Sequence, residues 1–177
     1  MSQPSNWSIM DVFDCIRSRP AVRSFRPDPI PEQVVKKILE AGRQAHSQRN
    51  RQPWRFVTIQ KPETLKQIGA LASSGPYIAG APLAIALVIE GAKNPYIDAT
   101  RAAECLMLAA WGEGVGSCWV GGLDRPQIKE LLGIPAEAEL VTVIPFGYPT
   151  AEEKDKKKVR RRLGKLAYRE RYGQPYA

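Results

Sequence analysis

Residues 83–89 read Leu-Ala-Ile-Ala-Leu-Val-Ile and are apolar at every position. A short apolar run of this kind is typical of a strand buried on both faces of a sheet. Residues 97–113 predict a long helix in which alanine, cysteine, leucine and methionine leave little polar surface. A helix that is apolar nearly all round lies at the centre of a domain or at a subunit interface.

Shorter elements surround this strand and helix. The apolar spacing and the proline and glycine positions predict a first helix that is capped by Ser8 and Asp11, has Ile9 on its apolar face and ends before Pro20. Extended chain at 19–25 follows, and then a helix from Pro31 to a C-cap at Gly42. Further strands are expected at 54–60, 117–120 and 140–146, and further helices at 63–71, between Asp124 and Gly133, and near 163–172. Because strands and helices alternate, we expect one mixed α/β domain over residues 1–177. Its extension, residues 148–177, is expected to lie on the domain, cover a partner subunit or stay mobile.

Composition bounds the class of protein. The chain has 177 residues, 44% of them hydrophobic, which suits one globular domain. Its longest apolar run, residues 81–89, is too short to cross a bilayer, and we find no signal-peptide pattern. An odd number of cysteines, three, indicates reduced thiols, so we expect a cytoplasmic protein. His46 is the single histidine. Multi-histidine metal sites are therefore excluded, and so are histidine-dependent catalytic triads unless His46 is the histidine of the triad.

The formal net charge is +8, and the positive residues gather in three clusters. Residues 17–26 and 43–55 each hold four arginines and no acid, while residues 154–162 hold seven lysines and arginines against one aspartate. Arginine suits bidentate phosphate binding, so the clusters indicate a phosphorylated ligand or a nucleic acid. Solvated surface charge is the alternative, and it is the better explanation for the third cluster taken alone.

Residues 45–54 read Ala-His-Ser-Gln-Arg-Asn-Arg-Gln-Pro-Trp and connect an expected helix to an expected strand. Such a polar segment is either a ligand-facing loop or an ordinary surface loop. No Gly-x-Gly-x-x-Gly follows a strand and no Walker sequence occurs, which argues against the two common nucleotide sites. No pair of carboxylates in polar loops suggests acid–base hydrolysis.

Four segments, in order, resemble the nitroreductase family of FMN-dependent oxidoreductases. They are Arg19-Pro20-Ala21-Val22-Arg23 with Phe25; residues 45–54; residues 114–122, Gly-Val-Gly-Ser-Cys-Trp-Val-Gly-Gly; and Phe-Gly-Tyr-Pro at 146–149 followed by Lys-Val-Arg-Arg-Arg-Leu at 158–163. Ala21 stands where the family has serine, and His46 stands where it has proline.

The resemblance implies a fold and an assembly. The fold is α+β and nitroreductase-like, with helices around a central mixed, mainly antiparallel sheet. A long central helix would lie in an extensive homodimer interface. Two FMN sites would be shared between the subunits, with the C-terminal extension packed on the partner subunit.

The resemblance also assigns roles around the FMN phosphate, a group that arginine binds through charge-assisted hydrogen bonds. Arg19 and Arg23 would hold the phosphate, in a segment where Pro20 is a neighbour and Ala21 offers its backbone N–H but no hydroxyl. Lys158 and Arg160 would close over it from the C-terminal segment, with Arg161 as the alternative to Arg160.

Contacts to the flavin ring are implied for two further segments. From the other subunit, Ser47 and Asn50 would hydrogen-bond the polar edge of the flavin ring or the ribityl chain, and Gln52 is a weaker candidate for the same contacts. His46 would either contribute only packing or donate a hydrogen bond to the substrate. Trp119 and Val120 lead to the ring, and Gly121 and Gly122 would present N–H groups near flavin N5, unusual φ values being open to glycine. For Trp119 the alternative is a core position, and for the glycines a plain turn.

The implied chemistry belongs to the cofactor. NAD(P)H would deliver hydride to FMN N5 and leave, after which a small organic acceptor such as a nitroaromatic or quinone takes the electrons. No side chain need act as nucleophile or base, so we expect no catalytic residue and no metal. Two alternatives stay open: another FMN reaction on the same fold, either reductive dehalogenation or flavin fragmentation, and a nucleic-acid-binding module built on the basic tail, although no recognised nucleic-acid motif is present.

Overall fold

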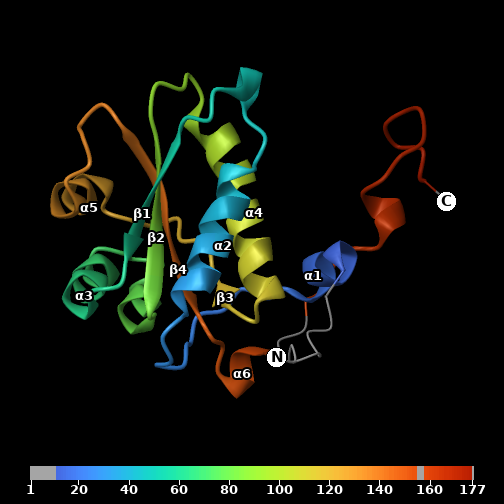
Figure 1. Cartoon of the computed structure of the whole chain (residues 1–177). Helices are drawn as coiled ribbons and strands as arrows, with labels where there is room; N and C mark the ends of the chain where they lie inside the picture. Colours follow the sequence, from blue (N-terminus) through green and yellow to red (C-terminus); the bar gives the residue numbers. More distant parts are fainter. Residues whose placement is uncertain (1–10, 155–157, 177) are drawn as a thin grey trace, which may run out of the picture.

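A computed structural model describes residues 11–154 and 158–176 (Figure 1). Its centre is one four-stranded sheet in the order β1-β2-β4-β3, formed by β1 (Trp54–Ile59), β2 (Leu83–Ile89), β3 (Gly116–Ser117) and β4 (Glu139–Gly147). Every strand pair in the described chain is antiparallel. The α+β class is therefore confirmed, with an antiparallel sheet in place of the expected mixed one.

Helices cover both faces of the sheet. In Figure 1, α2 (Glu32–Arg43) and α4 (Pro95–Gly112) lie on one face, and α3 (Pro62–Ala70) and α5 (Arg125–Leu132) on the other. Leu83, Ile85, Leu87 and Ile89 belong to the first hydrophobic cluster, whereas Ala84, Ala86 and Val88 belong to the second. Strand β2 is thus buried on both faces, as its unbroken apolar run predicts.

The helix expected at 97–113 is confirmed as α4, which begins two residues earlier because Pro95 suits the first helical position. Its inner residues Ala99, Ala102, Leu106 and Ala110 are fully buried. Helix α2 packs directly against it. The central position predicted for this helix is therefore confirmed.

Gly42 does not have its predicted role as a C-cap. Helix α2 continues through Arg43 and is capped by Gln44 in a right-handed conformation. A Cβ atom at Gly42 would lie 2.6 Å from Leu106 Cδ2 and 2.9 Å from Phe56 Cζ. The missing side chain allows α2 to approach α4 closely, which is a packing role.

Two expected elements are shorter than predicted. The strand at 117–120 is only Gly116–Ser117; beyond it the Val120 carbonyl accepts a hydrogen bond from the side-chain hydroxyl of Thr142 on β4 (2.8 Å), in place of a backbone ladder bond. The helix near 163–172 is one 3₁₀ turn, η3 (Leu163–Lys165), and Glu170 has a φ of 59° that no right-handed helix contains.

The N-terminal helix, α1 (Val12–Ser18), ends before Pro20 as predicted. Asp11 caps it by accepting hydrogen bonds from the backbone N–H groups of Phe13 and Asp14. Ser8 and Ile9 lie outside the described residues, as does the part of the prediction that concerns them.

The sequence pattern gave no sign of α6 (Ala151–Lys154), a single turn after β4. Beyond it the C-terminal segment, red in Figure 1, extends away from the sheet and its covering helices. None of the helices within residues 11–154 and 158–176 is long and apolar enough to span a membrane.

Candidate functional site

One pocket of about 430 Å³ brings together segments that are far apart in the sequence. The chain after α1 supplies Arg19, Ala21 and Arg23; helix α4 supplies Thr100, Ala103, Glu104 and Met107; and the chain after β3 supplies Cys118 and Trp119. Four of the predicted site residues, Arg19, Ala21, Arg23 and Trp119, therefore share one pocket. Pro20 is buried and does not line it.

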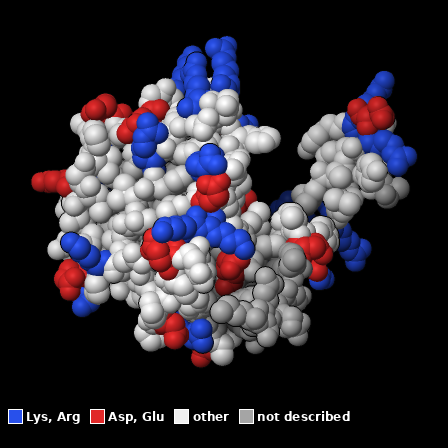
Figure 2. Space-filling view, in the orientation of Figure 1, with Lys and Arg blue, Asp and Glu red and all other residues white. Residues whose placement is uncertain are grey.

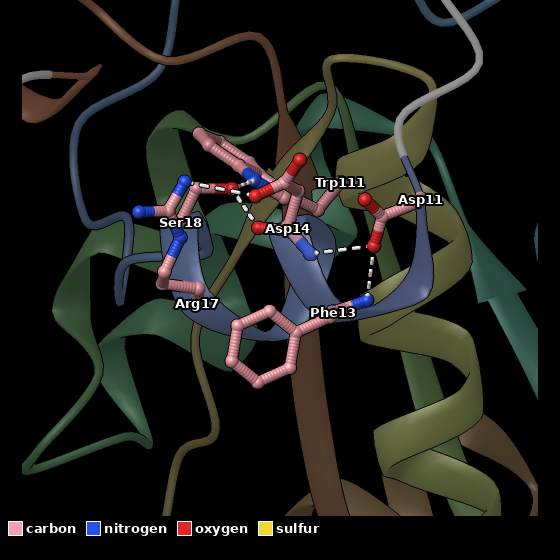
Figure 3. A network of polar contacts seen from close by, with 6 residues as sticks. All are labelled: Asp11, Phe13, Asp14, Arg17, Ser18 and Trp111. Carbon is pink, nitrogen blue, oxygen red and sulfur yellow. Dashed lines mark hydrogen bonds and ion pairs between the residues drawn. The ribbon is translucent and has the colours of Figure 1, made fainter.

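Figure 3 shows a hydrogen-bond network at the end of α1, directly before Arg19 in the chain. The Trp111 indole N–H, on α4, donates to the Ser18 hydroxyl at 2.8 Å, and that hydroxyl donates to the Asp14 carbonyl at 2.6 Å. Two residues beyond Pro20, buried Val22 donates its N–H to the Ser117 carbonyl at 3.0 Å. The segment is therefore fixed at both ends, and its alternate residues 19, 21 and 23 line the pocket.

The Arg19 guanidinium has a strong acceptor for some of its N–H donors but not for all of them. Its Nη2 donates to both oxygens of Glu104, at 2.8 and 3.0 Å. Its Nη1 lies 3.8 Å from Met107 Sδ, a weak acceptor. Its Nε is buried and has no hydrogen-bond partner among the residues that the structure describes. A guanidinium with a buried, unpartnered donor at a pocket wall suits an anionic ligand.

Arg23 stands beside a thiol and a phenol. The pKa of its guanidinium is raised, chiefly by the negative charge that Cys118 can carry and further by Tyr77. The Tyr77 hydroxyl donates to Cys118 Sγ at 3.3 Å, and burial together with this bond raises the pKa of Tyr77 to about 12. Tyr77 and Cys118 are site neighbours that the sequence reasoning missed, because each reads locally as an ordinary core residue.

Lys158 lies close to the positive charges of Arg19 and Arg160. Burial lowers its pKa, and the charges of Arg160 and Arg19 lower it further. Its Nζ donates to the Ile16 carbonyl on α1 at 2.7 Å, which ties the C-terminal segment to the chain just before Arg19. Arg161 is exposed. Lys158 is thus close enough to Arg19, Arg160 and Glu104 to feel the charge of each.

The loop that carries His46, Ser47, Asn50 and Gln52 does not reach this pocket within one chain. It has three non-glycine residues with positive φ, Arg49 at 54°, Asn50 at 55° and Gln52 at 50°. The Ser47 hydroxyl accepts from the Gln52 N–H at 2.9 Å, and the Gln52 amide donates to Asn50 Oδ1 at 3.2 Å. His46 is exposed.

Asp98 holds this loop in place and was not predicted from the sequence. Its side chain is buried on α4, and its carboxylate accepts the Gln48 N–H at 3.1 Å. An aspartate in a helix of small and apolar residues was the available signal. Because strained backbone persists only when its surroundings hold it, we infer that Asp98 maintains the loop.

Gly121 and Gly122 line a second pocket, of about 440 Å³, with Ser73 and Arg125 among its other residues. Neither glycine has a positive φ, so the unusual φ values that glycine permits are not used here. The Gly122 N–H donates to the Ser74 hydroxyl at 2.7 Å, and a Cβ at Gly122 would lie 2.6 Å from Ser73 Oγ. A glycine is therefore needed at position 122 because the backbone there lies close to Ser73 and Ser74 of the same chain. The Val120 side chain is buried in the core.

The surface charge is mixed. Figure 2 shows lysine and arginine interspersed with aspartate and glutamate over the visible face. Several surface cations have acidic partners, as in the pairs Arg43–Glu40 and Arg55–Glu90. No group of three or more potential metal ligands occurs in the part of the chain that the structure describes.

The chain is therefore an α+β protein in which helices cover an antiparallel sheet and two arginines line a pocket beside the long helix α4. The chain belongs to the nitroreductase family, whose family model matches residues 16–91 and 76–148. The resemblance drawn from its four segments is thereby confirmed.

Individual relatives agree with this assignment. A "Putative NADH dehydrogenase/NAD(P)H nitroreductase" of Methanothermobacter thermautotrophicus is 32% identical, over 80% of this chain and 79% of that protein. A 5,6-dimethylbenzimidazole synthase of Rhodospirillum rubrum is 29% identical, over 82% and 85%. The structure of an FMN-dependent nitroreductase from Clostridium difficile R20291 is similar with a TM-score of 0.76 and 24% identity, covering 92% of this chain and 98% of that one.

Proposed function

We propose that this chain is an FMN-dependent oxidoreductase that passes electrons from NAD(P)H to a small organic acceptor. The observation that carries the proposal is the convergence of Arg19, Ala21, Arg23 and Trp119 on one pocket in which the Arg19 Nε is buried without a described partner. A pocket of about 430 Å³ has the size of ordinary cofactor sites. Family membership and the names of the relatives support the same activity.

The residues present fit the phosphate end of FMN. Arg19 and Arg23 would bind the phosphate oxygens, and the Ala21 N–H would add a backbone donor. Lys158 would close the site from the C-terminal segment together with Arg160, with Arg161 as the alternative to Arg160. Bound FMN would supply the hydride chemistry itself.

The remaining ring contacts need a second subunit. Ser47, Asn50 and Gln52 lie outside the pocket of their own chain, so we assign them to the polar edge of a flavin held by the partner. Exposed apolar side chains support a homodimer: Val12 and Phe13 on α1 are 74% and 70% exposed, and Tyr172 in the C-terminal segment is 92% exposed. A cytoplasmic location is part of the proposal.

The acceptor we favour is a nitroaromatic or a quinone. Between β1 and β2 the chain forms α3 and the 3₁₀ helix η2 (Pro76–Gly80), whose residues Leu65, Ile68 and Ile78 are buried in the core and so supply no lid. An open site suits small, varied acceptors. Another FMN reaction, either reductive dehalogenation or flavin fragmentation, is the alternative, and one relative is indeed named a synthase and not a nitroreductase. A panel of nitroaromatics, quinones and halophenols tests which acceptors are reduced.

The test is a visible spectrum before and after reductant, on the wild type and on an Arg19→Ala/Arg23→Ala variant. We expect a yellow wild type that bleaches with NAD(P)H under anaerobic conditions. The double variant should bind FMN about 100-fold or more weakly, since each charged hydrogen bond is worth about 1.5–3 kcal/mol. Arg17→Ala is the matched control, because Arg17 is exposed and paired with Asp14. A colourless wild type that refuses FMN, or a double variant that retains it, overturns the proposal.

A further inference from the structure

Glu104 is the one carboxylate among the described residues that line the arginine pocket. It projects from the middle of α4, and both of its oxygens contact Arg19 Nη2, at 2.8 and 3.0 Å. The Glu104 side chain is 50% exposed, whereas that of Arg19 is 20% exposed. An accessible carboxylate therefore neutralises a largely buried guanidinium at the wall of the pocket.

The contact leaves part of Arg19 unused. A guanidinium has five N–H donors, and Glu104 engages only Nη2. A second anion could bind through Nε, but it would then lie close to the Glu104 charge. A phosphate monoester carries about −1.5 to −2 charges at neutral pH, and like charges repel most strongly where water is scarce.

Carboxylate and phosphate are alternative ligands of the same kind for arginine, because both accept its paired N–H donors. We propose that Glu104 competes with the flavin phosphate for Arg19 and so determines how strongly the protein prefers FMN to riboflavin. This inference rests on the proposed function. Without flavin, Glu104 keeps Arg19 oriented and its charge compensated beside Lys158; with FMN bound, Glu104 must release Arg19 or bear the repulsion.

Removal of the Glu104 charge tests this competition. In Glu104→Gln the side chain keeps its length and one acceptor oxygen, so Arg19 stays in place while the negative charge is lost. We expect FMN to bind about three- to tenfold more tightly, given the modest strength of partly exposed ion pairs and the added relief of repulsion. Riboflavin, which lacks the phosphate, should bind as it does to the wild type.

The experiment measures quenching of flavin fluorescence on titrating apo-protein with FMN and, separately, with riboflavin. Glu113→Gln is the matched control, because Glu113 follows α4 and pairs with Lys37 outside the pocket. Inorganic phosphate alone should also bind Glu104→Gln more tightly than the control, because it too would compete with the carboxylate for Arg19. Where riboflavin binds too weakly to measure, the FMN constants of the two variants decide.

The outcomes separate the two proposals. FMN binding that is equal in Glu104→Gln and Glu113→Gln, weaker in Glu104→Gln, or tightened equally for FMN and riboflavin overturns the competition while leaving a flavoprotein. A wild type that binds neither flavin overturns the proposed function itself. Circular dichroism of each variant checks that folding is unchanged, and Glu104→Ala, which removes the carboxylate entirely, should also favour FMN over riboflavin if the fold is intact.

Discussion

Arg19 and Arg23 reach the same pocket but have different neighbours. Arg19 meets the carboxylate of Glu104, both of whose oxygens contact its Nη2. Arg23 lies beside Tyr77 and Cys118, and its backbone N–H donates to the buried carboxylate of Glu153 at 3.2 Å. Each arginine therefore has a carboxylate close by, and the one beside Arg19 lines the pocket.

Tyr77 gives a prediction of pH dependence at this scale. Its pKa is about 12 in the folded protein against an ordinary value of 10.0, because burial and the bond to Cys118 favour the protonated phenol. The folded state thus keeps a proton that the unfolded chain releases, so this stabilisation is complete below pH 10 and is lost as the pH rises toward 12.

Thermal unfolding of the wild type and of Tyr77→Phe between pH 9 and 12 measures this effect. We expect the melting temperature of the wild type to fall more steeply above about pH 10 than that of the variant, which has no phenol to titrate. Tyr172→Phe, at a side chain 92% exposed, should follow the wild type. Parallel curves for the wild type and Tyr77→Phe would contradict the raised pKa.

At the scale of elements, α4 organises the whole site. Near the end of α4, Trp111 fixes α1 and therefore the start of the Arg19 segment. In the middle of α4, Glu104 and Met107 line the pocket. In its first turns, Asp98 holds the loop that carries Ser47. Its remaining faces pack against α2 and the sheet. A displacement of α4 would therefore disturb all three parts of the site together.

The close packing of α2 on α4 depends on Gly42. In Gly42→Ala the added methyl would meet Leu106 and Phe56 at under 3.0 Å. Overpacking costs about 1–3 kcal/mol and the gain in helix propensity returns up to about 1 kcal/mol, so we expect a net loss of about 1–2 kcal/mol in the free energy of unfolding.

Gly112→Ala is the matched control for this prediction. Gly112 is also helical, but a Cβ there meets nothing within 4 Å. Chemical denaturation should find Gly112→Ala as stable as the wild type or more so. A Gly42→Ala protein of equal or higher stability would show that Leu106 and Phe56 adjust freely.

The sequence predicts best where the apolar pattern is long. Strand β2 and helix α4 could be predicted because nearly all of their consecutive residues are apolar. That Arg19, Ala21 and Arg23 share a pocket could be predicted because their segment matches a family pattern. Glu104 and Asp98 could not, since their roles depend on segments about 85 and 50 residues away. The contacts of Gly122 with two serines could not be predicted either, because these serines are 48 and 49 residues distant in sequence but adjacent in the fold.

At the scale of the whole molecule, the candidate site is divided between two surfaces. Arg19 and Arg23 line a pocket, while Ser47 and Asn50 lie on a loop that this pocket does not include. A second subunit resolves the division if its loop meets the pocket of the first. The exposed apolar residues of α1 and of the C-terminal segment are the surfaces available for such an association.

The C-terminal segment therefore gives the prediction for the assembly. It folds on itself through a bridge between Tyr168 and Pro175 and a contact of the Arg169 guanidinium with the Tyr176 ring at 5.1 Å. Leu166 and Tyr172 nevertheless remain 59% and 92% exposed. Large apolar side chains on an ordered projection are typical of a surface that a partner covers.

Leu166→Glu/Tyr172→Glu should convert a wild-type dimer to a monomer, because a charge buried at the interface lacks a partner. Light scattering coupled to size-exclusion chromatography measures the mass, and Leu131→Glu, on the exposed side of α5 at 37%, is the control that should stay dimeric. The monomer should also bind FMN more weakly, since it lacks the partner's Ser47 and Asn50. A double variant that remains dimeric would exclude this segment from the interface, and a wild type that is monomeric yet retains FMN would place every flavin contact within one chain.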